Sequence, residues 1–179
     1  MRELNRKVLG IAVALLLAAM YVAPVLAKTK VAVTATQMGS GGSGAKSWLV
    51  DHGILQYRGM EGAGVVTLNI PGRDSLSGTS SSVINGKITF STDEPPPPGT
   101  PDPEAFGIIH LKMKWTFTGE GTTGTFEGQM QRKTTGVPLT HLEAHMVLQG
   151  TGDFKGQTLR LSAEGPGMPV NWEGFLLTS

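Results

Sequence analysis

The stretch at residues 108–118, with the sequence IIHLKMKWTFT, alternates regularly between apolar and polar residues. Successive side chains of an extended strand point to opposite faces, so this period of two separates an apolar face from a polar one. The apolar face contains Ile109, Leu111, Met113, Trp115 and Phe117, and the polar face contains His110, Lys112, Lys114, Thr116 and Thr118. We predict a strand that packs one face on a core and turns the other to water.

Similar alternation recurs on both sides of this stretch, and no helical periodicity is evident after residue 27. The further predicted strands are residues 30–37, 46–57, 64–70, 77–91, 122–132, 141–149, 154–163 and 170–177. The predicted turns include a flexible loop at 39–44, a connection at 59–62 and a hairpin near Asn85-Gly86. Closing the sheet hides its edges, so we expect an all-β fold, either a sandwich or, our choice, a single antiparallel eight-stranded up-and-down barrel.

Residues 28–179 form one domain in this interpretation, with a Pro-rich loop at residues 93–103 that cannot pair in a sheet. The chain has no cysteine, which excludes disulfides, thiolate metal sites and a cysteine nucleophile. Stability must therefore come from a continuous hydrogen-bonded core. The 25 glycines favour many turns and sheet bends over helices.

Residues 1–27 have the order of a secretory signal, with a basic start, an uncharged run, Pro24 and a small residue, Ala27, before Lys28. We predict a signal helix that is cleaved after Ala27. The alternative is an uncleaved membrane anchor, because the uncharged run is long enough, at about 20 residues, to span a bilayer. Both alternatives place residues 28–179 in a secreted or extracytoplasmic location.

The charge balance argues against a nucleic-acid partner. The chain has 15 basic and 14 acidic residues, and no basic stripe is evident along it. Nothing in the sequence indicates a cofactor. The oligomeric state is left open, and a membrane partner is expected only if residues 1–27 are retained.

A short pattern, Gly-x-Phe-x-Gly, occurs at residues 124–128 and again at 152–156. It suits a bend that enters a strand, with Phe126 and Phe154 turned into the core and glycines allowing close backbone approach. The second copy begins a sequence of turn, strand, Gly/Pro turn and terminal strand over the last 40 or so residues. This order resembles the closing strands of the allene oxide cyclase barrel superfamily, which includes plant dirigent proteins. The resemblance implies an eight-stranded antiparallel barrel with a central cavity, and it carries over no catalytic residue.

His141, Glu143 and His145 form the most suggestive candidate site. At alternate positions of a strand they share one face, opposite the apolar Leu142 and Ala144. Two imidazoles and a carboxylate are ligands for zinc or copper, and His110 is a candidate fourth group. The competing interpretation is an ordinary solvent face, because three residues in one row of a straight strand do not converge easily on one ion.

Other motifs do not support familiar chemistry. Residues 39–47 imitate a phosphate-binding loop, but Ala45 separates the glycine from Lys46 and no helix pattern follows. No Gly-x-Ser-x-Gly elbow is present for a serine hydrolase. Asp51-His52 would point to opposite faces of a strand and could not act as a pair there.

Two function classes remain. The first is a non-enzymatic binding or surface protein for a small apolar ligand or a protein partner. The second is an isomerase- or cyclase-like enzyme that acts on an apolar substrate in the barrel cavity. The side chains that either fill the barrel or line such a cavity are Trp48, Trp115, Trp172, Met113, Met130, Met146 and several Phe. A dry apolar interior favours binding or packing, whereas a buried carboxylate or imidazole beside a pocket favours catalysis.

Overall fold

The computed structural model describes residues 28–97, 99–119 and 121–178, and within these ranges it contains strands and no helix. The predicted all-β antiparallel class is confirmed. The signal helix predicted at residues 1–27 lies outside the described residues. The strands are β1 (Thr29–Ser43), β2 (Lys46–Leu49), β3 (Ile54–Asn69), β4 (Leu76–Thr89), β5 (Asp102–Gly119), β6 (Thr122–Val137), β7 (His141–Gly152), β8 (Thr158–Gly165) and β9 (Val170–Thr178).

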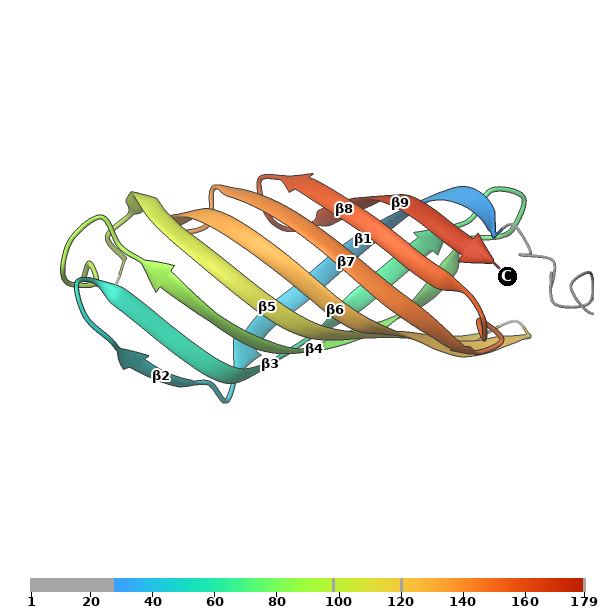
Figure 1. The fold of residues 1–179 in the computed structure, drawn as a ribbon, viewed down its shortest axis with the longest axis horizontal. Helices are drawn as coiled ribbons and strands as arrows, with labels where there is room; N and C mark the ends of the chain where they lie inside the picture. The colour runs from blue at the N-terminus through green and yellow to red at the C-terminus, as the bar shows by residue number, and fades with distance from the viewer. Residues whose placement is uncertain (1–27, 98, 120, 179) are drawn as a thin grey trace, which may run out of the picture.

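All described strands belong to one antiparallel sheet in the order β1-β9-β8-β7-β6-β5-β4-β3-β2. Strand β1 also pairs with β3, so hydrogen bonding continues around the sheet from β9 through β1 to β3. Figure 1 shows the consequence, since β1 crosses behind the front strands β5 to β8. Strand β2 pairs only with β3 and lies outside this circuit. Strands β3 to β6 have 14 to 18 residues and extend past β7 to β9, which have 8 to 12.

The alternation at residues 108–118 is confirmed in β5. Its predicted apolar face is buried, with Trp115 0% and Phe117 1% exposed, whereas Lys112 and Lys114 on the other face are exposed. The same alternation in β6, β7 and β9 turns Phe126, Leu148 and Trp172 inward. The core therefore lies inside the sheet, and the outer face is mostly polar.

Two predicted interruptions in the first half of the chain are wrong. Residues 39–43 are part of β1 and pair with β3 instead of forming a loop. Gly64, the partner of Gly39, lets β3 approach β1 closely, because a Cβ on Gly64 would lie 2.2 Å from the backbone oxygen of Met38. Residues 59–62 do not connect two strands but lie within β3, where the register with β4 shifts at a bulge between Tyr57 and Met60.

Two further predictions in this half are also wrong. Residues 46–57 are not one strand, because a turn at 50–53 separates β2 from β3, with Gly53 at a φ of 70°. Asn85-Gly86 is not a hairpin but the interior of β4. The Asn85 Oδ1 atom accepts a hydrogen bond of 3.0 Å from the Gly59 backbone N–H and so holds the opposite bulge in place. Tertiary pairing thus uses turn-forming residues to shape a continuous strand.

The two Gly-x-Phe-x-Gly segments pack against each other. The first lies within β6 and the second at the turn between β7 and β8, and Gly124 pairs with Gly152. The rings of Phe126 and Phe154 stack with centroids 4.6 Å apart, and both are buried as predicted. Phe117 meets both rings edge-on. Aromatic side chains therefore fill this end of the interior.

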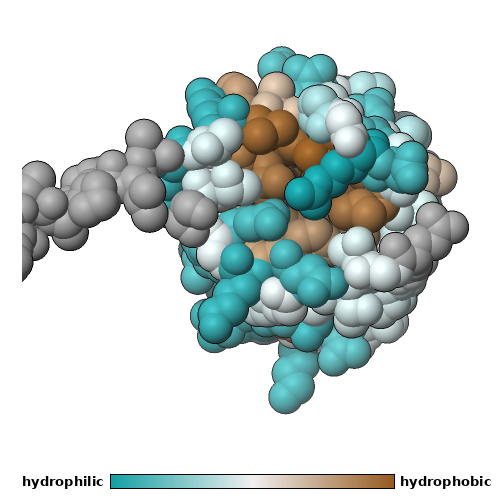
Figure 2. Space-filling view, turned by 90° about the vertical axis from the view of Figure 1, so that its right-hand side faces the viewer, coloured by the Kyte–Doolittle hydropathy of each residue, from teal (hydrophilic) through white to brown (hydrophobic). Residues whose placement is uncertain are grey.

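Figure 2 shows the end of the molecule where β9 terminates, with hydrophobic side chains gathered at the centre and hydrophilic ones around them. At this end Val31, near the start of β1, and Leu76, at the start of β4, pack against the core while remaining partly exposed. This end is thus closed by apolar packing. The opposite end carries β2 and the Pro-rich connection.

The Pro-rich connection spans residues 90–101, so it ends slightly before the predicted boundary at 103. Asp102, the first residue of β5, is 4% exposed and anchors this connection. Its carboxylate accepts hydrogen bonds from the backbone N–H groups of Ser91 at 2.8 Å, Ala105 at 3.1 Å and Glu104 at 3.2 Å. The Ser91 bond is the main cause that lowers the pKa of Asp102, and the other two act in the same direction against the effect of burial.

We expect Asp102→Asn to reduce stability above about pH 5 and to make little difference in strong acid. A carboxyl whose pKa is lower in the folded state stabilises the protein above its unfolded-state pKa, about 3.9. That stabilisation is lost as the pH falls through the lower folded-state value. Urea unfolding of both proteins from pH 7 to pH 2 measures the difference, with the exposed Asp74→Asn as control. A difference independent of pH would contradict the charged role of Asp102.

Candidate functional site

A cavity of about 60 Å³ lies inside the sheet, toward the end opposite the packed phenylalanines. Its wall is mainly apolar, with contributions from β1 and from β3 through β7 and β9. The lining residues are Gln37, Gly39, Gly62, Ala63, Ser80, Ser82, Ile84, Leu111, Met113, Met130, Arg132, Leu142, Ala144, Met168, Val170 and Trp172. This composition matches that of small-molecule sites, which are apolar with a few placed polar groups.

The space exists because β3 and β4 turn small residues inward at this level. Gly62 has no side chain, and Ser80 and Ser82 are the inward residues of the neighbouring strand. A Cβ on Gly62 would lie only 2.6 Å from the Ser82 Oγ atom. Large aromatic residues occupy the corresponding inward positions at the other end, where Phe126 and Phe154 stack. The inward side chains are therefore smaller at one end of the interior than at the other, and the cavity lies at the end with the smaller side chains.

Methionines form the movable part of the wall. Met113 and Met130 are buried, whereas Met168, in the turn between β8 and β9, lines the cavity and is also 52% exposed. The Met168 Cε atom would lie 2.9 Å from a Cβ on Gly39, so Met168 packs directly over that glycine. Met168 thus reaches from the cavity to the surface with an unbranched, flexible side chain.

The polar side chains of the cavity wall are Gln37, Ser80, Ser82, Arg132 and the indole N–H of Trp172. Gln37 donates from Nε2 to the Ser80 Oγ atom at 3.3 Å in a buried contact. The Trp172 Nε1 atom is buried and has no hydrogen-bond partner among the described residues. A buried N–H without an acceptor costs free energy, so the wall favours a group that accepts hydrogen bonds.

Arg132 is the one charged side chain among the described residues that line this cavity. It pairs with Ile109 on β5 and Ala144 on β7, both buried, so its side chain points to the interior. Its Nε atom is buried without a hydrogen-bond partner, and no described carboxylate forms an ion pair with it. Burial lowers the pKa of Arg132 and the nearby Tyr57 raises it. A guanidinium still remains charged at neutral pH.

Tyr57 lies in the same row of the sheet as Arg132. The row runs from Tyr57 on β3 through Gly86 on β4 to Ile109 and Arg132. Gly86 gives the Tyr57 ring its space, because a Cβ there would lie 2.9 Å from the phenol oxygen. Burial raises the pKa of Tyr57 despite the opposing effect of Arg132, so the phenol is neutral at physiological pH.

Sequence reasoning missed Arg132, although a signal was present. Alternation along the strand predicted at residues 122–132 puts Arg132 on the same face as Phe126 and Met130. A cation on the apolar face of a strand is unusual and identifies a position that needs a partner. The aromatic and sulfur side chains named as filling or lining the interior are buried, except Trp48, which is 40% exposed on β2.

The predicted metal ligands lie on the outer face of β7, as expected from the alternation, and fall into two pairs. His145 donates toward the Glu143 Oε1 atom across 3.4 Å, which is the leading cause that lowers the pKa of Glu143. His141 lies 3.7 Å from the Glu164 Oε1 atom of β8 instead. Among the described residues, no group of three or more His, Asp or Glu is arranged to hold a metal ion. The metal site at His141, Glu143 and His145 therefore stays a prediction.

His110, the candidate fourth ligand, is also on the outer face. It pairs with Gln131 of β6, which in turn pairs with His145 of β7. Both imidazoles border an outer depression of about 520 Å³. Strand β6 lies between β5 and β7, so His110 and His145 are one strand apart and cannot act as adjacent ligands.

We expect zinc or copper to leave the melting temperature unchanged, because the two histidines of β7 face different carboxylates. Bound metal would instead stabilise the fold by RT ln(1 + [L]/Kd), about 2.7 kcal/mol at a hundredfold excess over Kd. Thermal melts with each metal ion, beside the His141→Ala/His145→Ala double variant, measure this. A rise in the wild-type melting temperature that the double variant lacks would establish the metal site.

Asp51 and His52 do contact each other, contrary to the expectation for a strand. They lie in the turn between β2 and β3, where His52 has a φ of 45°. The His52 Nε2 atom is 3.2 Å from the Asp51 Oδ2 atom, and its Nδ1 atom is 3.8 Å from Asp93. The side chains of Asp51 and His52 are 73% and 77% exposed, so the pair lacks the enclosed surroundings of a catalytic site.

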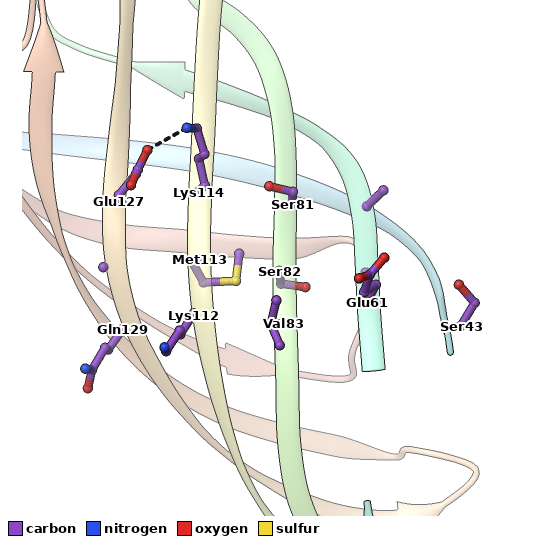
Figure 3. A pocket seen from close by; sticks show the side chains of 13 residues that line it. Ser43, Glu61, Ser81, Ser82, Val83, Lys112, Met113, Lys114, Glu127 and Gln129 are labelled. Carbon is purple, nitrogen blue, oxygen red and sulfur yellow. Dashed lines mark ion pairs between the residues drawn. The ribbon is translucent and has the colours of Figure 1, made fainter. Parts of the chain in front are cut away.

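A larger depression of about 790 Å³ lies over β3 to β6 and is shown in Figure 3. Its charged residues are Glu61, Lys112, Lys114 and Glu127. Figure 3 shows Lys114 and Glu127 pointing toward one another, and their ion pair measures 2.6 Å with both side chains about half exposed. Their hydrogen bond is the main cause that lowers the pKa of Glu127. Since Lys114 and Glu127 pair with each other and all four charged residues are exposed, this surface needs a ligand less than the interior cavity does.

Neither membrane-spanning helices nor similarity to known proteins indicates a function for this cavity. The described part of the chain contains no helix with the length and apolarity needed to cross a membrane. No protein-family model, no curated protein and no solved structure matches this chain.

Proposed function

We propose that this protein is a non-enzymatic binding protein that holds a small, mainly apolar ligand in the interior cavity. The observation that carries the proposal is the cavity itself, which lies within the buried hydrophobic core and is bordered by the half-exposed Met168. Protein interiors are normally packed without such voids, and each void lowers stability. A retained void with an adaptable wall is typical of a ligand site.

The cavity volume limits the ligand. About 60 Å³ holds a few water molecules or a group of similar size, whereas benzene needs about 150 Å³. A ligand with one aromatic ring therefore displaces Met168 or shifts Met113 and Met130 when it enters. We propose a molecule of about this size, or a longer one whose end alone enters the cavity.

The alternative, an isomerase- or cyclase-like enzyme, lacks an observation in its favour. General acid–base catalysis needs a titratable group within hydrogen-bond reach of the substrate. Among the described residues that line the cavity, none is Asp, Glu or His. Arg132, which does line the cavity, can hold a ligand through its charge, which suits binding.

We also propose that the circuit of strands formed by β1 and β3 to β9 is an eight-stranded up-and-down barrel of the allene oxide cyclase type. Support comes from the pairing of β1 with both β9 and β3, and from sequential neighbours throughout the order. The late Gly/Phe turn followed by two terminal strands adds to this support. The relationship concerns architecture and transfers no activity.

Export of the chain is part of the same proposal, with cleavage after Ala27. We expect mass spectrometry of protein from the native host to give a chain that begins at Lys28. The physical reason is the order of basic residues, apolar run and small residue in residues 1–27. An intact N-terminus in the membrane fraction would establish an anchored protein instead.

Toluene is a suitable neutral probe for the cavity. We expect it to shift the methyl NMR signals of Met113, Met130 and Met168 in methyl-labelled protein, and to do so saturably. Met38, which is 51% exposed, provides the internal control on the outer surface. Unchanged signals, or equal shifts at Met38, would overturn the binding function.

A matched pair of variants on β7 tests the location. Ala144 is 1% exposed and lines the cavity, whereas Val147 on the other face is 44% exposed. Ala144→Leu is expected to fill the cavity and abolish the toluene shifts, and Val147→Leu to preserve them. If Ala144→Leu fails to fold, Ser82→Val provides a smaller filling change on β4.

A further inference from the structure

The interior contains a cation that nothing described neutralises. Arg132 turns its side chain inward and is partly exposed as a whole, but its Nε atom is buried, and its guanidinium forms no hydrogen bond or ion pair with a described residue. A buried N–H of a charged group that lacks a partner lowers the stability of the fold. Because Arg132 lines the cavity without a partner among the described residues, we look for its partner in a ligand.

The groups around Arg132 do not supply that explanation. Tyr57 is the one described titratable group that raises the pKa of Arg132, but the raised pKa of Tyr57 itself keeps the phenol neutral, so it does not neutralise the guanidinium. The nearby cavity wall adds one more donor that lacks a described partner, the Trp172 Nε1 atom. A cation and an unpartnered N–H around one apolar space complement a group that is anionic and accepts hydrogen bonds.

We propose that the ligand is a small carboxylic acid whose carboxylate pairs with Arg132 while its apolar part contacts Met113, Met130 and Trp172. This rests on the proposed binding function and adds the chemical class of the ligand. A carboxylate matches the planar guanidinium and adds only three heavy atoms, which suits a cavity of about 60 Å³. A phosphate monoester carries more charge and volume than this mostly apolar wall can accommodate.

Benzoate and benzyl alcohol test the proposal, because they share the ring and differ in the anionic group. Isothermal titration of the wild-type protein at pH 7 is expected to show benzoate binding at least about tenfold tighter, the typical gain from a hydrogen bond to a charged group. Arg132→Met is expected to remove this preference and to keep benzyl alcohol binding. Arg160→Met, an exposed change on β8, is expected to keep the preference.

The outcomes separate the two levels of the proposal. Equal affinity of benzoate and benzyl alcohol for the wild-type protein overturns the carboxylate inference and leaves apolar binding in place. Binding of neither compound, together with unchanged methionine signals on addition of toluene, overturns the binding function itself. A benzoate preference that persists in Arg132→Met also overturns the inference, because another group would then hold the anion.

The stability of Arg132→Met provides a second readout that does not depend on a ligand. If Arg132 serves ligand binding, its replacement by an apolar side chain of similar length is expected to leave the melting temperature equal or higher. In wild-type protein, benzoate is expected to raise the melting temperature and benzyl alcohol to raise it less. A large drop in the melting temperature of Arg132→Met would assign Arg132 a structural role and overturn the inference.

Discussion

Met113→Lys is expected to lower the free energy of unfolding by about 3–5 kcal/mol, the cost of burying a charge without a partner. Met113 is 3% exposed on the inward face of β5. None of the described residues that line the cavity beside it is acidic, and Arg132 already contributes a positive charge there. The new ammonium group would therefore be desolvated and repelled. Urea unfolding of the variant and the wild type at pH 7 measures the loss.

Lys112→Met is the matched control on the same strand. Lys112 is exposed on the opposite face, so its change is expected to alter the free energy of unfolding by no more than about 0.5 kcal/mol. If Met113→Lys unfolds at the wild-type urea concentration, the inward face of β5 has been assigned incorrectly. Equal losses in both variants would contradict the sidedness of the strand.

Trp115→Ala is expected to cost about 3–5 kcal/mol, the usual range for deleting a large buried aromatic side chain. Trp115 is 0% exposed, and its ring meets Trp172 edge-on with centroids 6.5 Å apart. Its strand neighbours are Phe126 on β6 and Ser80 on β4. Removing the indole would join its volume to the nearby hollow part of the interior, so the surroundings cannot easily collapse. Thermal and urea unfolding both measure the effect.

Phe106→Ala on the same strand controls for the loss of an aromatic residue. Phe106 is 42% exposed on the outer face of β5 and buries much less area than Trp115. Its replacement is expected to cost less than about 1 kcal/mol. A loss for Trp115→Ala as small as that for Phe106→Ala would show that the core does not centre on the tryptophan pair.

Much of the fold could be predicted from local patterns. Alternation assigned the inward and outward faces of β5 correctly, because strand geometry fixes that relation wherever one face is buried. The phenylalanines of the repeated Gly-x-Phe-x-Gly segments were correctly predicted to be buried. What local patterns could not give is that the two segments pack on each other, since Gly124 meets Gly152 only through strand pairing.

Turn signals failed where tertiary pairing overrode them. Asn85-Gly86 is a strong local hairpin signal, yet β4 continues through it because the bulge of β3 needs the Asn85 side chain and Tyr57 needs the space at Gly86. The glycine-rich residues 39–43 were predicted to form a loop, but they extend β1, because they pair with β3 through the backbone. Local propensity for turns is small beside the hydrogen bonds of a long ladder.

The sequence by itself determined the all-β class, the inward faces of β5 and β7 and the absence of disulfides, because these follow from side-chain periodicity and composition. It placed the histidines of β7 on the polar side for the same reason. Only the tertiary structure decided which inward positions touch. The cavity wall combines residues from distant parts of the chain, namely small residues of β3 and β4, methionines of β5, β6 and the β8–β9 turn, and Arg132. Their shared cavity depends on the register between strands, which no local pattern specifies.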